Sequence, residues 1–319
     1  MIDPINIKLL DKFVPKKLNL VICSASFEER CHKIVTTLYN QVSCDKYLIL
    51  YNSNEYEEIN KNATNLQEKM EGSILVELNT NEPVSNTVKI NKILNDLLVT
   101  SVENIFLDTT TFTHETLLIV FKLLYEKKDR YSNLLMGYIG AKEYSTEESD
   151  MEKKWLSSGI STIRSVVGYP GVNSPARENH LIVLVGFEAD RTNHLIDLME
   201  FSTISLGFGP EDDSIDVSHQ KLNYARHKKL MEKYEGANEF CFSLTDPKEA
   251  EKLILEQVSK YPNHNTVIAA MNNKISTIGA GLAAINNPKF QLIYAKPIEY
   301  NVKGYSKPSD QVYLYQIDF

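Results

Sequence analysis

The stretch LNLVICSASFEER, residues 18–30, sets the fold class of this chain. Its first half is a continuous apolar run, which is typical of a strand buried on both faces of a parallel sheet. A helical pattern, CHKIVTTLYNQV, follows at once. Similar runs alternate with helical patterns along the chain, which indicates βαβ units and an α/β fold. The predicted strands are 18–23, 47–51, 74–78, 104–108, 134–139, 181–185, 203–208, 239–244, 266–271 and 291–295.

These strands form two series that match element for element at an offset of about 160 residues. Each first strand is followed by Phe-Glu and then by an arginine, at 27–30 and at 187–191. We therefore predict two Rossmann-like, mostly parallel-sheet units related by internal duplication. The alternative is that any two βαβ domains share such an order. The turn-rich GYPG at 168–171 places the boundary near Gly171, which gives units 1–171 and 172–319.

The amino-acid composition limits the kinds of partner that the protein can bind. The 319 residues carry a formal net charge of −8, which argues against a general duplex nucleic-acid binder, because such binders need many phosphate-neutralising cations. The four cysteines lack CxxC spacing, which favours reduced thiols in a cytoplasmic protein. No signal peptide or membrane span is visible in the sequence, so we expect no membrane partner.

Ligands of open parallel sheets bind beyond the carboxyl ends of the strands, where the strand order reverses. The loop after the first strand offers Ser24, Ser26, Glu28 and Arg30 as ligand-binding candidates, since small residues leave room and an arginine can hold an anion. The alternative is structural, with Ser26 capping a helix and Glu29 completing a capping box.

The loop after the fourth strand is DTTTFTHE, residues 108–115. Its hydroxyls suit ribose or phosphate hydrogen bonding, and the ligand-binding candidates here are Thr109, Thr110 and Thr111. Three further residues could supply acid or base catalysis, namely Asp108, His114 and Glu115. The alternative is an ordinary helix start, in which Thr113 caps the helix and His114 faces solvent.

The second copy offers Glu188 and Arg191 after its first strand. After its fourth strand it offers Asn272, Asn273, Lys274 and Thr277, where the lysine suits a phosphate contact. The glycines that follow, at 279 and 281, favour either close ligand approach or simple packing. We find no metal-binding or dinucleotide fingerprint, so the sequence predicts no metal and no other cofactor.

Tandem Rossmann-like units with a hydroxyl-rich turn after strand four resemble the CARF and SAVED group of cyclic-oligonucleotide sensors. Residues 108–111 and 273–277 look like variants of the threonine/glycine/lysine turn of CARF domains. The first copy lacks the lysine and the second lacks the aspartate before the turn. The resemblance implies ligand sensing in bacterial antiviral defence.

Three functions therefore compete. The first is a sensing module for a nucleotide or cyclic oligonucleotide. The second is a subunit of a multi-protein defence assembly, with a protein partner or homo-oligomer, since fold alone does not imply function. The third is an enzyme acting on a nucleotide or another phosphorylated small molecule. The sequence leaves open whether either pocket is catalytic.

Overall fold

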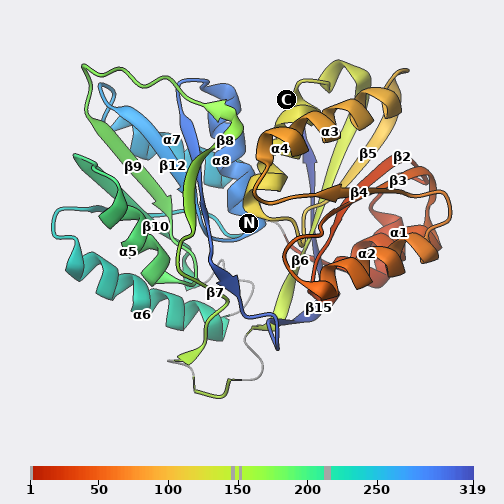
Figure 1. The fold of residues 1–319 in the computed structure, drawn as a ribbon, viewed down its shortest axis with the longest axis horizontal. Helices are drawn as coiled ribbons and strands as arrows, with labels where there is room; N and C mark the ends of the chain where they lie inside the picture. Colours follow the sequence, from red (N-terminus) through yellow and green to blue (C-terminus); the bar gives the residue numbers. More distant parts are fainter. Residues whose placement is uncertain (1–2, 145–147, 151–152, 212–216) are drawn as a thin grey trace. The chain divides into compact units, whose positions relative to one another are not determined.

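The computed structural model describes residues 3–144, 148–150, 153–211 and 217–319 (Figure 1). Its contacts divide the chain into two compact units. We call Ile2–Lys142 together with Ser306–Phe319 the N-terminal unit, and Glu143–Tyr305 the C-terminal unit. Each is a sheet with helices packed on it, so the predicted α/β class with two Rossmann-like units is confirmed.

The N-terminal unit has a sheet with the order β1-β15-β6-β5-β2-β3-β4. The strands from β4 to β6 in this order are parallel to their neighbours, and β1 is antiparallel to β15. The strand bounds are β1 Ile5–Asn6, β2 Lys17–Ala25, β3 Ser43–Asn52, β4 Ile74–Leu78, β5 Val102–Asp108, β6 Tyr131–Tyr144 and β15 Ser306–Ile317. The helices are η1 Ile7–Lys12, η2 Glu29–His32, α1 Lys33–Gln41, α2 Glu57–Lys69, α3 Pro83–Leu97, α4 His114–Tyr125 and η3 Lys128–Arg130.

The C-terminal unit has a sheet with the order β11-β10-β9-β12-β13-β8, in which only β8 is antiparallel to its neighbour. A separate two-stranded sheet pairs β7 with β14. The strand bounds are β7 Ser157–Ser158, β8 Thr162–Pro170, β9 Asn179–Leu184, β10 Thr203–Phe208, β11 Asn238–Cys241, β12 Asn265–Ala270, β13 Gln291–Lys296 and β14 Glu299–Tyr300. The helices are α5 Ala189–Leu198, α6 Val217–Lys233, α7 Pro247–Ser259 and α8 Lys274–Asn286.

The two sheets share one plan. In each, the five parallel strands follow the order third, second, first, fourth, fifth, so the strand order reverses between the first and fourth strands. The first strands are almost wholly buried, as their apolar runs predict. In α8, a Cβ added at Gly279 would lie 2.7 Å from Ala250 Cβ on α7. This glycine therefore serves the close packing of α7 on α8.

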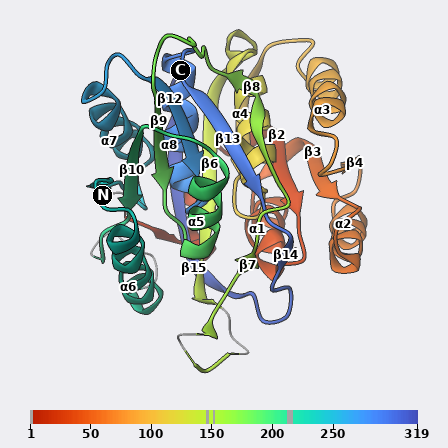
Figure 2. The same cartoon turned by 60° about the vertical axis from the view of Figure 1, so that its left-hand side comes forward.

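In each sheet the strand beside the fifth parallel strand, which we call the sixth strand, comes from an unexpected part of the chain. After the first series ends at β6, β8 follows in the sequence but pairs with β13 of the second series (Figure 2). After the second series ends at β13, β15 follows but lies beside β6 of the first. The chain thus exchanges its sixth strands reciprocally. The contacts divide at 142/143 and 305/306, whereas the sequence placed the boundary near Gly171 and residues 311–317 in the second unit.

The strand exchange predicts an unusual response to truncation. We expect deletion of residues 306–319 to loosen the N-terminal unit, because β15 covers the edge of β6 and its Val312 is fully buried in the core around β2. Hydrogen-exchange mass spectrometry should show lost amide protection in β5 and β6, with β9 and β12 still protected.

The point variant Val312→Ala, which leaves the strand in place, should give the same pattern in milder form. Loss of protection confined to residues 143–305 in either variant would contradict the exchange.

Candidate functional site

The hydroxyls after β5 form hydrogen bonds inside the N-terminal unit. Thr111 Oγ1 donates to the carbonyl of buried Ser24 at 2.7 Å. Thr109 Oγ1 donates to Gly137 O at 3.0 Å, and Ile139 N donates to Thr110 Oγ1 at 3.2 Å. These bonds join the β5 loop to β2 on one side and to β6 on the other. The three threonines thus hold the strand ends together at the point where the strand order reverses.

Asp108 lies beneath this loop and is 2% exposed. Its Oδ1 accepts from Thr110 N at 3.1 Å and from Thr110 Oγ1 at 2.6 Å. Burial raises the pKa of Asp108 to about 7, while the hydrogen bonds from Thr110 and the charge of Arg30 act in the lowering direction. His114 begins α4, whose N-cap is Thr113, as the structural alternative predicted. Glu115 is buried in the first turn of this helix.

Two further predicted residues of this unit, Glu28 and Arg30, form a buried ion pair. Arg30, 4% exposed, donates from Nε and Nη2 to Glu28 Oε2, at 2.8 and 2.6 Å. Its Nη1 donates to Ile139 O on β6 at 2.9 Å, and Glu28 Oε2 also accepts from Ser306 Oγ on β15 at 2.7 Å. The pair therefore joins the end of β2 to both β6 and β15.

The serine before this pair does not complete the predicted capping box. Ser26 Oγ accepts from Glu28 N at 3.4 Å, and Glu28 rather than Ser26 is the N-cap of η2. Ser26 O accepts from Asn62 Nδ2 at 2.8 Å, so its backbone is held by α2. Ser26 is thus held in place by hydrogen bonds within the N-terminal unit.

The switch point of the C-terminal unit is closed by direct backbone contact. A Cβ added at Gly186 would lie 1.9 Å from Met271 O, so only glycine permits this approach of the β9 and β12 loops. Asn272 Nδ2 donates to Val185 O at 2.6 Å. Asn273 caps α8 by accepting from Ser276 N at 2.9 Å, and Thr277 Oγ1 donates to Asn273 O at 2.8 Å. Lys274 is the first residue of α8 and half-buried.

A cavity of about 460 Å³ lies beside the loop that joins β9 to α5. We call it the β9–α5 pocket. Five of its lining residues are cationic and two are carboxylates, an excess of three positive charges in a chain whose net charge is −8. It is lined by Lys153, Lys154, Trp155, Ser157, Ser158, Gly159, Glu188, Ala189, Asp190, Arg191, Asn193, His194, Arg226, Lys229 and Leu230.

Two of the predicted ligand-binding residues, Glu188 and Arg191, line this pocket. Glu188 Oε1 accepts from Leu156 N at 2.7 Å and from Ser157 N at 2.9 Å. Burial raises the pKa of Glu188, against the lowering effect of Arg191 and of these backbone donors.

Arg191 is 9% exposed, and its Nη1 donates to Ser157 Oγ at 3.0 Å while its Nη2 donates to Ala295 O. Its Nε has no acceptor among the described residues. A buried guanidinium with an unused donor is costly, because the desolvated N–H is not compensated.

The α6 side of the pocket was not predicted. Arg226 donates to Lys154 O at 2.7 Å and to Phe187 O at 3.2 Å, and its guanidinium lies 4.3 Å from the Phe187 ring centroid. These bonds hold the segment before β7 against α6. Lys229 is exposed at the rim, and Trp155, the only tryptophan of the chain, is half-buried. The basic run ARHKK in α6 was the signal available in the sequence.

The remaining sequence-predicted residues do not line this pocket. The structure brings Glu188 and Arg191 together there, whereas the Asn272–Thr277 loop packs on the end of β9 instead. Within the described ranges, no group of three or more His, Cys, Asp or Glu side chains could hold a metal ion. No helix in the described part of the chain is long and apolar enough to cross a membrane.

Comparison with known proteins gives little similarity. No protein-family model matches the chain, and no curated protein matches it. Among solved structures, the crystal structure of an N-terminal ketoreductase from a macrolactin assembly line matches at 9% identity with a TM-score of 0.24. The match covers 89% of this chain and 57% of the ketoreductase chain, so this chain spans little more than half the length of that structure. A likeness at this TM-score carries no argument, so function has to be derived from this chain's own side chains.

The raised pKa of Asp108 predicts a pH-dependent stability. Its folded-state pKa of about 7 exceeds the ordinary value, so the folded state binds the proton more tightly. The contribution of this group to the free energy of unfolding is fully present below about pH 4, and it is lost as the pH rises through about 7. Asp108→Asn keeps the acceptor for Thr110 but cannot ionise. At pH 8 the variant should therefore unfold at a higher urea concentration than the wild type. Its free energy of unfolding should be higher by on the order of 1 to 3 kcal/mol.

Asp45→Asn is the matched control, because the pKa of the exposed Asp45 is lowered, first by its hydrogen bond from Lys17. Its variant should lose a little stability at pH 8. Equal urea midpoints for wild type and Asp108→Asn at pH 5 and at pH 8 would show that Asp108 is not desolvated in the folded state.

Proposed function

We propose that this chain binds a phosphate-bearing, nucleotide-type small molecule in the β9–α5 pocket. The observation that carries the proposal is the local excess of positive charge in an otherwise acidic chain. Cations gathered around a cavity raise the local concentration of an anionic ligand and stabilise it once bound. The cavity volume of about 460 Å³ lies in the range of small-molecule sites.

The phosphate would lie between Arg191 and Lys229. Arg191 supplies a rigid, buried guanidinium, and Lys229 supplies a flexible ammonium from the rim. The first residues of α5, Ala189 and Asp190, also line the pocket. Backbone N–H groups at the start of a helix favour an anion, which adds to the two side chains.

The rest of a nucleotide suits the other walls. Trp155 offers an aromatic face on which a base can stack. The carboxylates of Glu188 and Asp190 can accept hydrogen bonds from ribose hydroxyls. We therefore favour a nucleotide over a simple phosphorylated acid, which would make no contact with the aromatic wall or with the carboxylates.

The resemblance to cyclic-oligonucleotide sensors directs the choice of ligands. We propose a sensing role of this kind, in bacterial antiviral defence, as the biological setting of the pocket. Cyclic oligonucleotides accordingly belong in the first ligand panel, together with mononucleotides and linear dinucleotides.

The single tryptophan gives a direct assay. Because Trp155 lines the pocket, a bound nucleotide should quench or shift the intrinsic fluorescence of the unmodified chain. Lys229→Glu should weaken the measured affinity about tenfold or more, since it reverses a charge beside the ligand. Lys289→Glu makes the same charge change at an exposed position of the C-terminal unit outside the pocket, and should leave affinity within about twofold.

Two results would overturn the proposal. One is an unchanged fluorescence and melting temperature with every nucleotide of the panel. The other is an equal loss of affinity in Lys229→Glu and Lys289→Glu, which would mean that only the overall charge of the chain matters.

A further inference from the structure

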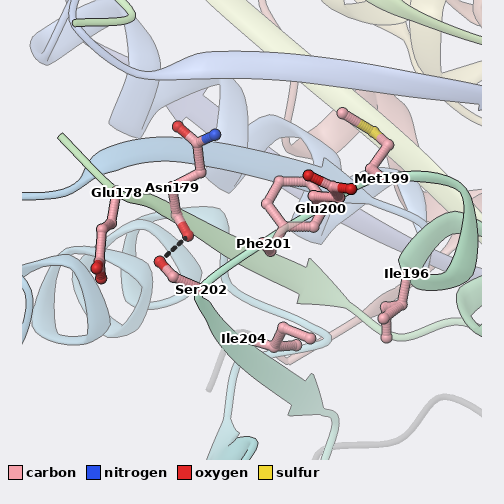
Figure 3. Close-up of a pocket in the computed structure, with 8 residues that line it drawn as sticks. All are labelled: Glu178, Asn179, Ile196, Met199, Glu200, Phe201, Ser202 and Ile204. Atoms are coloured by element: carbon pink, nitrogen blue, oxygen red, sulfur yellow. Dashed lines mark hydrogen bonds between the residues drawn. The ribbon is translucent and has the colours of Figure 1, made fainter. Parts of the chain in front are cut away.

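A second cavity of about 490 Å³ lies in the C-terminal unit at the amino ends of β9 and β10 (Figure 3). Parallel strands place their amino ends at the sheet edge opposite to their carboxyl ends, and this cavity shares no lining residue with the β9–α5 pocket. We call it the amino-edge pocket. It is lined by Glu178, Asn179, Ile196, Met199, Glu200, Phe201, Ser202 and Ile204.

The floor of the amino-edge pocket is apolar. Ile196 on α5 is 8% exposed and belongs to the core of the unit. Met199, Phe201 and Ile204 are partly buried and pack against the same core. The pocket therefore leaves core side chains half-covered, and the unbranched methionine can adapt its shape to an incoming group. Contact with an apolar group would complete the burial of this floor.

The charges around this floor are all of one sign. Glu178 and Glu200 are the ionisable residues of the lining, and none of the eight lining residues is basic. The Glu178 side chain is 71% exposed, and its Oε2 lies 3.3 Å from His264 Nε2. Glu200 has no ion-pair partner among the described residues. Two carboxylates above an apolar floor are complementary to a cation carried on an apolar stem.

The polar atoms between the carboxylates are already used by the chain. Ser202 Oγ donates to Asn179 O at 3.1 Å, the dashed line in Figure 3. Asn179 Oδ1 accepts from Asn265 Nδ2 at 3.0 Å. These bonds fix the start of β9 against the start of β10 and of β12. The wall is thus preformed, and Glu200, the Oε1 of Glu178 and the floor remain for an external group.

We propose that the amino-edge pocket docks a basic segment of a partner polypeptide, which inserts an arginine or lysine next to an apolar residue. The long side chains of these residues combine an apolar stem with a terminal cation, which matches the floor and rim. The proposal is independent of the nucleotide site, because the two pockets share no residue.

Magnitudes favour a polypeptide over a free small amine. An ion pair with a carboxylate as exposed as Glu178 contributes little by itself, about 0 to 1 kcal/mol. Useful affinity therefore requires several contacts on one molecule. A chain segment supplies a cation and an apolar side chain together, so each contact after the first is made without a new loss of translational freedom.

The test is selection of a random twelve-residue phage library on the full-length chain, with counter-selection against the double variant Glu178→Gln/Glu200→Gln. We expect recovered peptides that carry arginine or lysine next to an apolar residue. A recovered peptide, labelled with fluorescein, should bind the double variant at least tenfold more weakly than the wild type in fluorescence anisotropy.

The matched control is Glu232→Gln/Glu235→Gln, which makes the same charge change at exposed positions of the same unit. Its affinity for the peptide should stay within twofold of wild type, and Phe201→Ala should weaken the peptide severalfold through loss of the apolar floor. The proposal is overturned if no basic peptides remain after counter-selection. It is also overturned if both glutamine double variants lower the affinity for the peptide equally.

Discussion

The reciprocal pairing of two strands is the constraint on which this structure depends. β8 pairs with β13, and β15 lies beside β6, although each follows the other series in the sequence. The fifth strand of a Rossmann-like sheet would otherwise end in a row of unpaired backbone groups, which invites pairing with another chain. Here β8 covers the edge of β13, and β15 covers the edge of β6. Residues 143–305 contain the whole sheet of the C-terminal unit, whereas the sheet of the N-terminal unit is complete only when Ser306–Phe319 has been added to Ile2–Lys142.

The same plan explains why a glutamate and an arginine follow the first strand of each series. In both units the arginine donates to a carbonyl of the fifth strand, Ile139 O in one and Ala295 O in the other. The glutamate accepts from Ser306 Oγ at the start of β15 in one unit, and from the backbone at Ser157 on β7 in the other. A buried ion pair stabilises a fold only when its remaining hydrogen bonds are satisfied. Arg30 meets that condition through Glu28, whereas the buried Nε of Arg191 has no acceptor among the described residues. The two copies share this arrangement, and in the second copy both residues also line a pocket.

The candidate loops follow the first and fourth strands of each sheet, as the sequence indicated, but the sequence did not give the direction of their side chains. Thr109 and Thr111 end a buried strand in the expected place, yet their hydroxyls donate to Gly137 and Ser24 carbonyls. A hydroxyl at a strand end looks the same in sequence whether it faces a ligand or a neighbouring strand. For a related reason, the sequence indicated only some of the residues that line the β9–α5 pocket. Glu188 and Arg191 were visible from the repeat, whereas Lys154, Trp155 and Lys229 come from segments whose proximity depends on how β7 and α6 pack.

By itself, the sequence determined the α/β class, the positions of the ten parallel strands and the two-series plan. These features depend on burial, and a strand that is buried on both faces has a continuous run of apolar residues that can be recognised in the sequence. Only the tertiary structure decided which sheet receives β8 and which receives β15, and which cations surround a cavity. The reason is physical. The edges of β6 and β13 present the same backbone N–H and C=O groups, so strand pairing carries little side-chain information. The β9–α5 pocket, in turn, lies where Arg226 joins α6 to the carbonyls of Lys154 and Phe187, three segments that are far apart in the sequence.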